Sequence, residues 1–355
     1  MHRYPYNWKL KDSNFTKDKG KVFSCFSCGG GSTMGYKLAG FDVIGCNEID
    51  PKMMDAYKAN HNPKYSYLES IVTFKDREDL PEELYNLDIL DGSPPCSSFS
   101  MAGNREKDWG KEKKFKEGQA EQVLDTLFFD FIDLANKLQP KIVVAENVKG
   151  LLLGDAKEYV RRIYKEFDKA GYYCQHWLLD ASTMGVPQRR ERVFFICLRK
   201  DLAAPLLVQK DMFTKAPELK LDFKEPKILF KDVFKDYTDR PLTENMKKIW
   251  NLRKDGDSDF EHINIREFNK PNLHFNHKFI YQNSSNINTI TAGDLCVLFD
   301  YPRYRNFDEL CECGSYPKDY DFKKLKPEYL IGMSVPPVMT AQIANEIYKQ
   351  WIQTL

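Results

Sequence analysis

The sequence lacks long apolar runs and carries almost no excess of charge of either sign. No stretch approaches the roughly 18 to 20 consecutive apolar residues that cross a membrane, so we expect no membrane-spanning segment. The first residues, 1–21, carry charges throughout and contain no apolar segment typical of a signal peptide, so we expect a cytoplasmic protein. The formal net charge is only +1, so any surface that binds a polyanion must be a local patch.

The nine cysteines are scattered and odd in number, which is typical of reduced thiols when no secretory signal is present. A four-thiol zinc site would need Cys25 and Cys28 together with Cys311 and Cys313. Cys25 should lie in or beside the first strand, only one residue separates Cys311 from Cys313, and no nearby histidine completes the pattern. We therefore expect no metal, and at least one thiol available for chemistry.

Short apolar segments alternate with helical stretches over roughly the first 200 residues. Hydrophobic residues make up 42% and charged residues 30% of the 355, which is typical of a globular protein with a large and a smaller domain. The alternation predicts an α/β fold with a doubly wound, mostly parallel, Rossmann-like sheet. The predicted strands cover residues 21–28, 41–46, 87–90, 141–145 and 192–198, and the predicted helices cover residues 32–39, 119–138 and 157–170.

The pattern changes after residue 199. Residues 200–286 combine scattered prolines, many lysines and aspartates, and short uneven apolar clusters, which indicates a second, irregular lobe. An apolar stripe in residues 337–355 predicts a final helix that packs back on the sheet. We predict a large domain from residues 1–199 plus 325–355 and a small domain from residues 200–324.

A run of three glycines follows the first predicted strand. Gly29, Gly30 and Gly31 would let the backbone approach a ligand closely and would open a helix whose amide groups face that ligand, although such a run can also be a simple flexible turn. Glu48 ends the next strand, where an acid is placed to accept hydrogen bonds from ribose hydroxyls. Together these features favour a nucleoside-bearing cofactor.

A double proline aims one cysteine away from the end of a strand. Pro94 and Pro95 stiffen the backbone before Cys96, at the carboxyl edge of the sheet where doubly wound folds bind their ligands. A cysteine taken alone is most often a small buried thiol, but three serines within the next four residues make this turn polar. We therefore interpret Cys96 as a nucleophile, and the lysine-rich loop 103–118 as a segment that closes on the substrate.

Glu146 ends another buried strand, after the apolar residues 142–145, and needs either a partner such as a lysine or a role in the chemistry. Further along, Gln188, Arg190 and Arg192 alternate along an extended segment, so their side chains should share one face. That face offers amide and guanidinium donors suited to carbonyl or phosphate oxygens.

In order and spacing, these residues resemble the motifs of the cytosine carbon-5 DNA methyltransferase family, over nearly the whole chain outside the middle lobe. Ser70 stands where the family commonly has an aspartate that contacts adenine, and Met333 stands where it has an asparagine. The segments that match are the cofactor loop 26–31 with Glu48, the Pro-Cys motif 93–100, the Glu-Asn-Val motif 146–148, the Gln-x-Arg-x-Arg motif 188–192, the carboxyl-terminal motif 332–335, and the preceding segments 288–293 and 305–320.

The resemblance implies that a methyl group passes from S-adenosylmethionine, leaving S-adenosylhomocysteine, to carbon 5 of a flipped cytosine in double-stranded DNA, with Cys96 as the covalent nucleophile. It implies that Glu146 protonates ring nitrogen 3 and holds the exocyclic amine, and that Arg192 holds the carbonyl oxygen. For Arg190 it implies a contact with the loop or with the thiolate, and for Gln188 a contact with the nearby backbone or with DNA. The cofactor contacts that it implies come from Phe26, Gly29, Gly30, Gly31, Glu48, Ile49, Ser70, Ile71, Pro94, Leu127, Ser334 and Val335.

By the same resemblance, the middle lobe reads bases in the major groove, and the protein is a monomer associated with the nucleoid, with a cognate restriction endonuclease as a partner if it belongs to a restriction-modification system. One alternative is a transfer RNA cytosine-5 methyltransferase, although the Cys-Phe-Thr signature of that branch is absent. Another is a catalytically silent DNA-binding relative, against which the joint presence of Cys96, Glu146 and both arginines argues. A nicotinamide dehydrogenase would share the glycine turn but has no use for the Pro-Cys and Glu-Asn-Val motifs.

Overall fold

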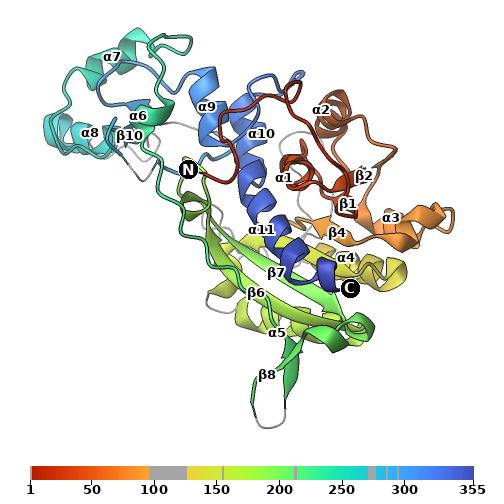
Figure 1. The fold of residues 1–355 in the computed structure, drawn as a ribbon. Coiled ribbons are helices and arrows are strands. Elements are labelled where there is room, and N and C mark those ends of the chain that lie inside the picture. Colours follow the sequence, from red (N-terminus) through yellow and green to blue (C-terminus); the bar gives the residue numbers. More distant parts are fainter. Residues whose placement is uncertain are drawn as a thin grey trace.

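The computed structural model describes residues 2–95, 126–153, 156–211, 214–270, 277–284, 287–293 and 296–355. Cys96, the lysine-rich loop 103–118 and the first part of the predicted helix 119–138 lie outside these residues. The described chain forms a central sheet with helices on both faces and a smaller lobe beside it (Figure 1). No helix in these ranges is long and apolar enough to cross a membrane.

The central sheet has seven strands in the order β3-β2-β1-β4-β5-β7-β6. Neighbours from β3 to β5 pair in parallel, whereas β7 is antiparallel to both β5 and β6. This arrangement confirms the predicted doubly wound, mostly parallel α/β fold. The strands are β1 (Lys21–Cys25), β2 (Asp42–Glu48), β3 (Tyr65–Leu68), β4 (Ile89–Gly92), β5 (Ile142–Val148), β6 (Tyr172–Asp180) and β7 (Glu191–Arg199).

Successive residues of β5 point into two separate cores, because side chains alternate across a strand. Val143 and Ala145 belong to the core beneath α3, α4 and α5, whereas Ile142 and Val144 belong to the core beneath α1 and α11. Burial on both faces explains why this strand begins with a continuous apolar run. The helices of the large domain include α1 (Gly31–Ala39), α2 (Pro51–His61), α3 (Ile71–Asp76), α4 (Leu127–Leu138), α5 (Ala156–Lys169) and α11 (Pro337–Gln350).

Helix α11 lies beside α1 (Figure 1). Its residues Val338, Ile343 and Ile347 are buried in the same core as Val22 of β1 and Val144 of β5. The prediction that a final helix packs back on the sheet is therefore confirmed.

The small lobe has an apolar cluster of its own, which includes Trp250, Phe260 and Phe279. In Figure 1 the lobe lies to one side of the sheet, beyond α9. The elements between residues 230 and 298 are α6 (Phe230–Val233), α7 (Glu244–Trp250), α8 (Phe260–Phe268), β10 (Phe279–Ile280) and β11 (Val297–Leu298).

The segment that leads from β7 to this lobe contains a hairpin of β8 (Leu207–Gln209) and β9 (Lys215–Pro217). After the hairpin, Leu219 joins the core beneath α11, and Trp351 Nε1 donates a hydrogen bond to Glu218 O at 2.8 Å. Residues 215–221, which fall within the predicted small domain 200–324, therefore pack on the large domain.

Helices α9 (Phe307–Cys313) and α10 (Pro327–Met333) follow the small lobe in the chain. The buried carboxylate of Glu309 accepts two hydrogen bonds from the buried guanidinium of Arg303, at 2.8 and 2.9 Å. Lys235 N also donates to Glu309, at 2.8 Å. Because Lys235 lies between α6 and α7 and Arg303 follows β11, this one carboxylate holds together the chain segments on either side of α7, α8, β10 and β11.

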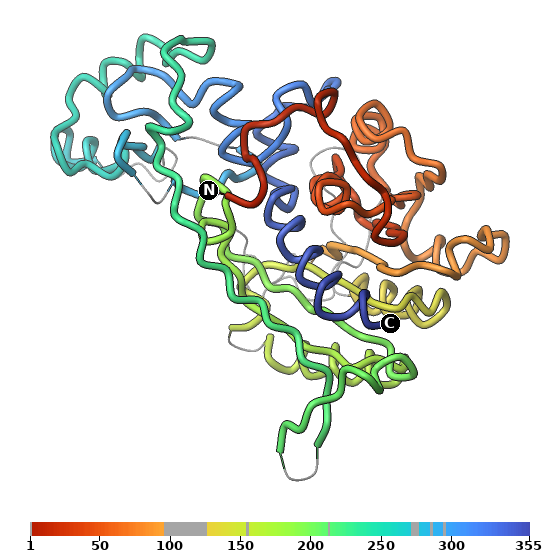
Figure 2. The backbone as a smooth tube through the Cα atoms, in the orientation of Figure 1, coloured from red at the N-terminus to blue at the C-terminus, as the bar shows by residue number. Residues whose placement is uncertain are grey.

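The amino-terminal residues run across the carboxyl-terminal helices before they enter β1 (Figure 2). Trp8 is buried, and its Nε1 donates to Ser315 O at 2.9 Å. Arg3 Nη1 lies 2.8 Å from Glu346 Oε1 on α11. Contacts with residues at the far end of the sequence therefore fix this segment.

Candidate active site

The carboxyl ends of the parallel strands and the start of β7 lie at the same edge of the sheet. Because β7 is antiparallel to β5, its residue Arg192 is in register with Val148, the last residue of β5. β4 lies on the other side of β5 and ends in Gly92, just before Pro94. Three of the predicted motifs thus meet at the edge where doubly wound folds bind ligands.

Glu146 and Arg192 form an ion pair at this edge, with Arg192 Nε 2.9 Å from Glu146 Oε1. Their side chains are only 12% and 17% exposed, so water screens the pair less than it screens a surface ion pair. The partner of Glu146 is therefore an arginine from the Gln-x-Arg-x-Arg segment. Together the two side chains present acceptor and donor groups next to each other.

Asn147, next to Glu146, holds the backbone that leads to Cys96. Its Nδ2 donates to Pro94 O at 3.0 Å, and the side chain is buried. Its Oδ1 accepts from Val148 N at 2.9 Å, which fixes the amide orientation. The end of β5 thus positions the double-proline turn at the end of β4. Cys96 itself lies outside the described residues.

Gln188 and Arg190 bind backbone carbonyls of the carboxyl-terminal part of the chain. Gln188 Nε2 donates to Cys313 O at 2.8 Å, and Arg190 donates to Ile290 O and Gly332 O at 3.0 and 2.9 Å. Both side chains are 2% exposed. The predicted donors to carbonyl oxygens are thus present, and in the described structure those oxygens are the protein's own. Burial lowers the pKa of the Arg190 guanidinium to about 9, and the charge of Arg192 acts in the same direction.

The turn after β1 is held by Glu48. The Glu48 carboxylate accepts hydrogen bonds from Cys28 N, Ile49 N and Asp50 N at 2.8 to 2.9 Å. Burial raises the pKa of Glu48, and these three N–H donors oppose that rise. Within the turn, Phe26 and Cys28 adopt left-handed backbone conformations, with φ of 51° and 46°, which cost energy for residues other than glycine.

The glycines of this turn are required by close packing against the protein itself. Gly30 has φ of 82°, and a Cβ there would lie 2.3 Å from His61 Nε2. A Cβ on Gly31 would lie 2.3 Å from Val335 O and 2.8 Å from Ser334 Cβ. The structure therefore brings the glycine turn into contact with the 332–335 motif, and a side chain at Gly31 would force these segments apart.

The other residues predicted to contact a cofactor differ in exposure. Ser70 caps α3 by accepting from Val72 N at 3.3 Å and is half-buried, as is Ile49. Ile71 and Leu127 are each 2% exposed and belong to the core beneath α3 and α4. Their side chains therefore contribute to the core of the large domain, and a direct contact with a cofactor stays a prediction for them.

A buried acid that no sequence motif indicated lies beside the glycine turn. Asp91 of β4 accepts from Ser24 Oγ and Ser32 Oγ at 2.8 Å each and from Tyr36 OH at 3.1 Å. Burial raises its pKa to about 6, although the three hydroxyl donors act in the opposite direction. An acid inside an otherwise apolar strand was the signal that could have identified it, as it did for Glu146.

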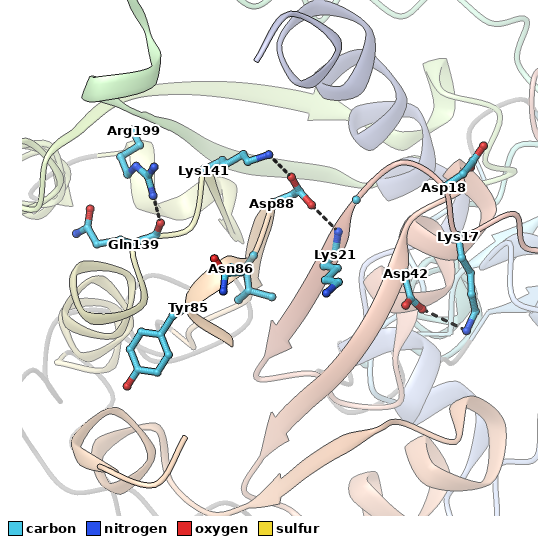
Figure 3. Close-up of a pocket in the computed structure, with 12 residues that line it drawn as sticks. Lys17, Asp18, Lys21, Asp42, Tyr85, Asn86, Asp88, Gln139, Lys141 and Arg199 are labelled. Carbon is cyan, nitrogen blue, oxygen red and sulfur yellow. Dashed lines mark hydrogen bonds and ion pairs between the residues drawn. The ribbon is translucent and has the colours of Figure 1, made fainter. Parts of the chain in front are cut away.

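A pocket of about 460 Å³ lies at the opposite, amino edge of the parallel strands (Figure 3). Two ion pairs lie within it, Lys141 with Asp88 at 2.7 Å and Lys17 with Asp42 at 3.2 Å. In the described ranges no group of three or more His, Cys, Asp and Glu residues is placed to hold a metal. The candidate site is therefore the carboxyl edge, where the motifs meet.

The model of the C-5 cytosine-specific DNA methylase family matches residues 20–349. The type II methyltransferase M.FnuDI of Fusobacterium nucleatum is 39% identical over 182 residues, 51% of this chain and 48% of that protein, so the match spans about half of that relative. The type II methyltransferase M1.HphI of Haemophilus parahaemolyticus is 28% identical over 337 residues, 91% of this chain and 85% of that protein. The solved structure of the S. pombe Dnmt2 methyltransferase has a TM-score of 0.60 at 16% identity, covers 92% of this chain and 98% of that one, and shows the shared fold.

Proposed function

This chain belongs to the C-5 cytosine-specific DNA methylase family, and on that premise we propose that it transfers a methyl group from S-adenosylmethionine to carbon 5 of a cytosine within a short sequence of double-stranded DNA. The observation that carries the proposal is the meeting of three motifs at one edge of the sheet. Glu146 is paired with Arg192, and Asn147, next to Glu146, holds Pro94, two residues before Cys96.

The cofactor site that we propose is formed by the turn after β1 and the ends of β2 and β3. A carboxylate has about four acceptor directions, and Glu48 uses three of them for backbone N–H groups, so one is left for a ribose hydroxyl. Leu68 and Val72, 50% and 41% exposed, flank Ser70 and offer apolar surface for a purine ring. These groups fit S-adenosylmethionine, which supplies an electrophilic methyl group when it is bound.

Carbon 5 of cytosine is a weak nucleophile, so the ring must first be activated. We propose that the Cys96 thiolate forms a bond to carbon 6 while ring nitrogen 3 receives a proton, which moves electron density to carbon 5. Carbon 5 then takes the methyl group and loses its proton to a base that we expect to be water. The carbon–sulfur bond breaks as the double bond between carbons 5 and 6 forms again, ring nitrogen 3 returns its proton to Glu146, and Cys96 is released as the thiolate.

The pair of Glu146 and Arg192 matches the polar edge of a cytosine. Glu146 would accept from the exocyclic amine and, when protonated, donate to ring nitrogen 3, while Arg192 would donate to the carbonyl oxygen. Because a stacked base cannot present this edge together with carbon 6, the base must be flipped from the duplex, at a cost of a few kcal/mol.

We assign target recognition to the small domain, predicted as residues 200–324, whose core is the cluster around Trp250 and Phe260. The buried pair of Arg303 and Glu309 would fix the orientation of this lobe relative to the catalytic edge. Gln188 and Arg190 would act by holding segments 287–293 and 332–335 against the start of β7.

The test is to sequence DNA from cells that express the protein, by a method that resolves modified cytosines base by base, with the Cys96→Ala variant as the control. One fully modified short motif that is absent with the variant would establish both activity and specificity. Unmodified DNA together with modified transfer RNA would favour the RNA-directed alternative. A folded protein that binds the cofactor and modifies neither would be a silent relative.

A further inference from the structure

A polar cluster interrupts the otherwise apolar core beneath α1. Side chains alternate along a strand, so Ser24 faces the same side as Val22, and Asp91 the same side as Ile89. Val22 and Ile89 belong to the core beneath α1 and α11. Asp91 is 3% exposed, and no lysine, arginine or histidine in the described ranges forms an ion pair with it. Such a carboxylate is costly to bury, so an apolar residue would serve the core better.

The contacts of Asp91 connect the two ends of the turn after β1. Ser24 is the register neighbour of Asp91 on β1 and lies two residues before Phe26. Ser32 lies in the first turn of α1, directly after the three glycines. Both hydroxyls donate to the same oxygen, Asp91 Oδ2, at 2.8 Å, and Tyr36 from the next turn of α1 donates to Oδ1. One carboxylate therefore spans the base of this turn.

We propose that Asp91 is a positioning residue of the cofactor site. It fixes the separation between β1 and the start of α1, and it thereby holds Phe26 and Cys28 in the left-handed conformations that the turn requires. This inference depends on the proposed function in one respect, namely that the cofactor is S-adenosylmethionine.

The double-proline turn is held by a different residue, because Asn147 Nδ2 donates a hydrogen bond to Pro94 O. Asp91 and Asn147 therefore act on different steps. Loss of the Asp91 carboxylate weakens cofactor binding, whereas loss of the Asn147 amide slows the methyl transfer.

The experiment compares full-length wild type with Asp91→Ala, Asp91→Asn and Asn147→Ala. Calorimetry gives the Kd for S-adenosylhomocysteine, and steady-state methylation of DNA gives kcat and the KM for S-adenosylmethionine. We expect Asp91→Ala to raise both Kd and KM about tenfold or more, since small misplacements in a site have effects of this size. We expect kcat at saturating cofactor to change less than about threefold. Asn147→Ala should instead lower kcat and leave the Kd for S-adenosylhomocysteine and the KM for S-adenosylmethionine nearly unchanged.

Asp91→Asn should recover most of the binding, because its Oδ1 can accept from Tyr36 and its amide can donate to the hydroxyl oxygens of Ser24 and Ser32. The double variant Ser24→Ala/Ser32→Ala serves if Asp91→Ala does not fold, and it should also raise the Kd. Asp88→Asn is the matched control, since Asp88 lies just before the opposite end of β4 and pairs with Lys141.

An unchanged Kd in folded Asp91→Ala, or a rise in Kd of the same size in Asp88→Asn, overturns the inference. A wild-type protein that neither binds S-adenosylhomocysteine nor methylates DNA instead contradicts the proposed function, whatever the variants do.

Discussion

Arg192 Nε lies 2.9 Å from Glu146 Oε1, and this contact joins the first polar residue of β5 to the start of β7. Each group neutralises the other while no base is present. A cytosine that enters the site can take over both partners, because its edge offers donors to the acid and an acceptor to the arginine. The hydrogen-bonding groups of this pair are therefore complementary to the cytosine edge that we propose it binds.

Glu146→Gln should slow methyl transfer by about 100-fold to 10,000-fold, the range that general acid catalysis contributes. The amide can still contact the exocyclic amine but cannot deliver a proton to ring nitrogen 3. DNA binding, measured by fluorescence anisotropy, should stay within about threefold of wild type. Full activity in this variant would refute the assigned role.

Cys96→Ser should reduce turnover by about a thousandfold or more, as removal of an essential nucleophile does. A serine hydroxyl is far less ionised than a thiol near neutral pH, so the bond to carbon 6 forms poorly. Mass spectrometry of the enzyme incubated with S-adenosylmethionine and DNA that contains 5-fluorocytosine checks the covalent step, because after methyl transfer a fluorinated carbon 5 has no proton whose loss could release Cys96. A stable adduct should form with wild type and not with the variant.

Asn147→Ala should lower kcat about tenfold while the Kd for S-adenosylhomocysteine stays constant, because the variant frees only the double-proline turn. The lost hydrogen bond should also lower the free energy of unfolding by about 1 kcal/mol. Urea titration and steady-state kinetics on the same preparation measure both. An equal change in cofactor affinity would show that the two turns are not held separately.

Glu309→Gln should lower the free energy of unfolding by about 3 kcal/mol, because it leaves the buried Arg303 guanidinium without its counter-charge. The substitution is isosteric, so loss of packing volume does not contribute. Thermal unfolding followed by circular dichroism measures the change. Lys247→Ala removes a surface ion pair with Glu244 and serves as the comparison, with an expected change below about 1 kcal/mol.

The raised pKa of Asp91 predicts that the free energy of unfolding depends on pH. Burial raises its pKa from 3.8 to about 6 in the folded protein, so the folded state binds the proton more tightly than the unfolded chain. The stability associated with the protonated acid is fully present below pH 4 and is lost as pH rises through about 6. Asp91→Asn should lack this dependence, and urea titrations of both proteins between pH 4 and pH 7.5 test it by their difference. A constant difference would contradict the raised pKa.

The central strands could be predicted because they are buried on both faces and form continuous apolar runs, as in residues 142–145 before Glu146. β6 could not be predicted, because it is an edge strand in which Gln175 is half-buried and His176 is exposed, and these two polar residues interrupt any apolar run. β3 is short and is likewise at an edge. The predicted strand 87–90 began early, since β4 covers Ile89–Gly92.

The motifs of the site were visible because each follows a strand, but their partners were not. Arg190 donates to carbonyls 100 and 142 residues away, and Gln188 to one 125 residues away. A local sequence pattern does not show which distant backbone carbonyl will accept a hydrogen bond from a side chain. The network of Asp91 was missed for a related reason, since its three donors are ordinary hydroxyls that have many other uses on the surface of a protein.

The contact of the glycine turn with Leu330, Ser334 and Val335 has a consequence for biosynthesis. The turn leaves the ribosome well before Leu330, Ser334 and Val335, which pack against Gly29 and Gly31 and are encoded much later in the chain. A nascent chain can therefore form the first strands and still lack one wall of its cofactor turn. The turn can be completed only after residue 335 has been synthesised, so a chain released before that residue would leave the turn unfinished.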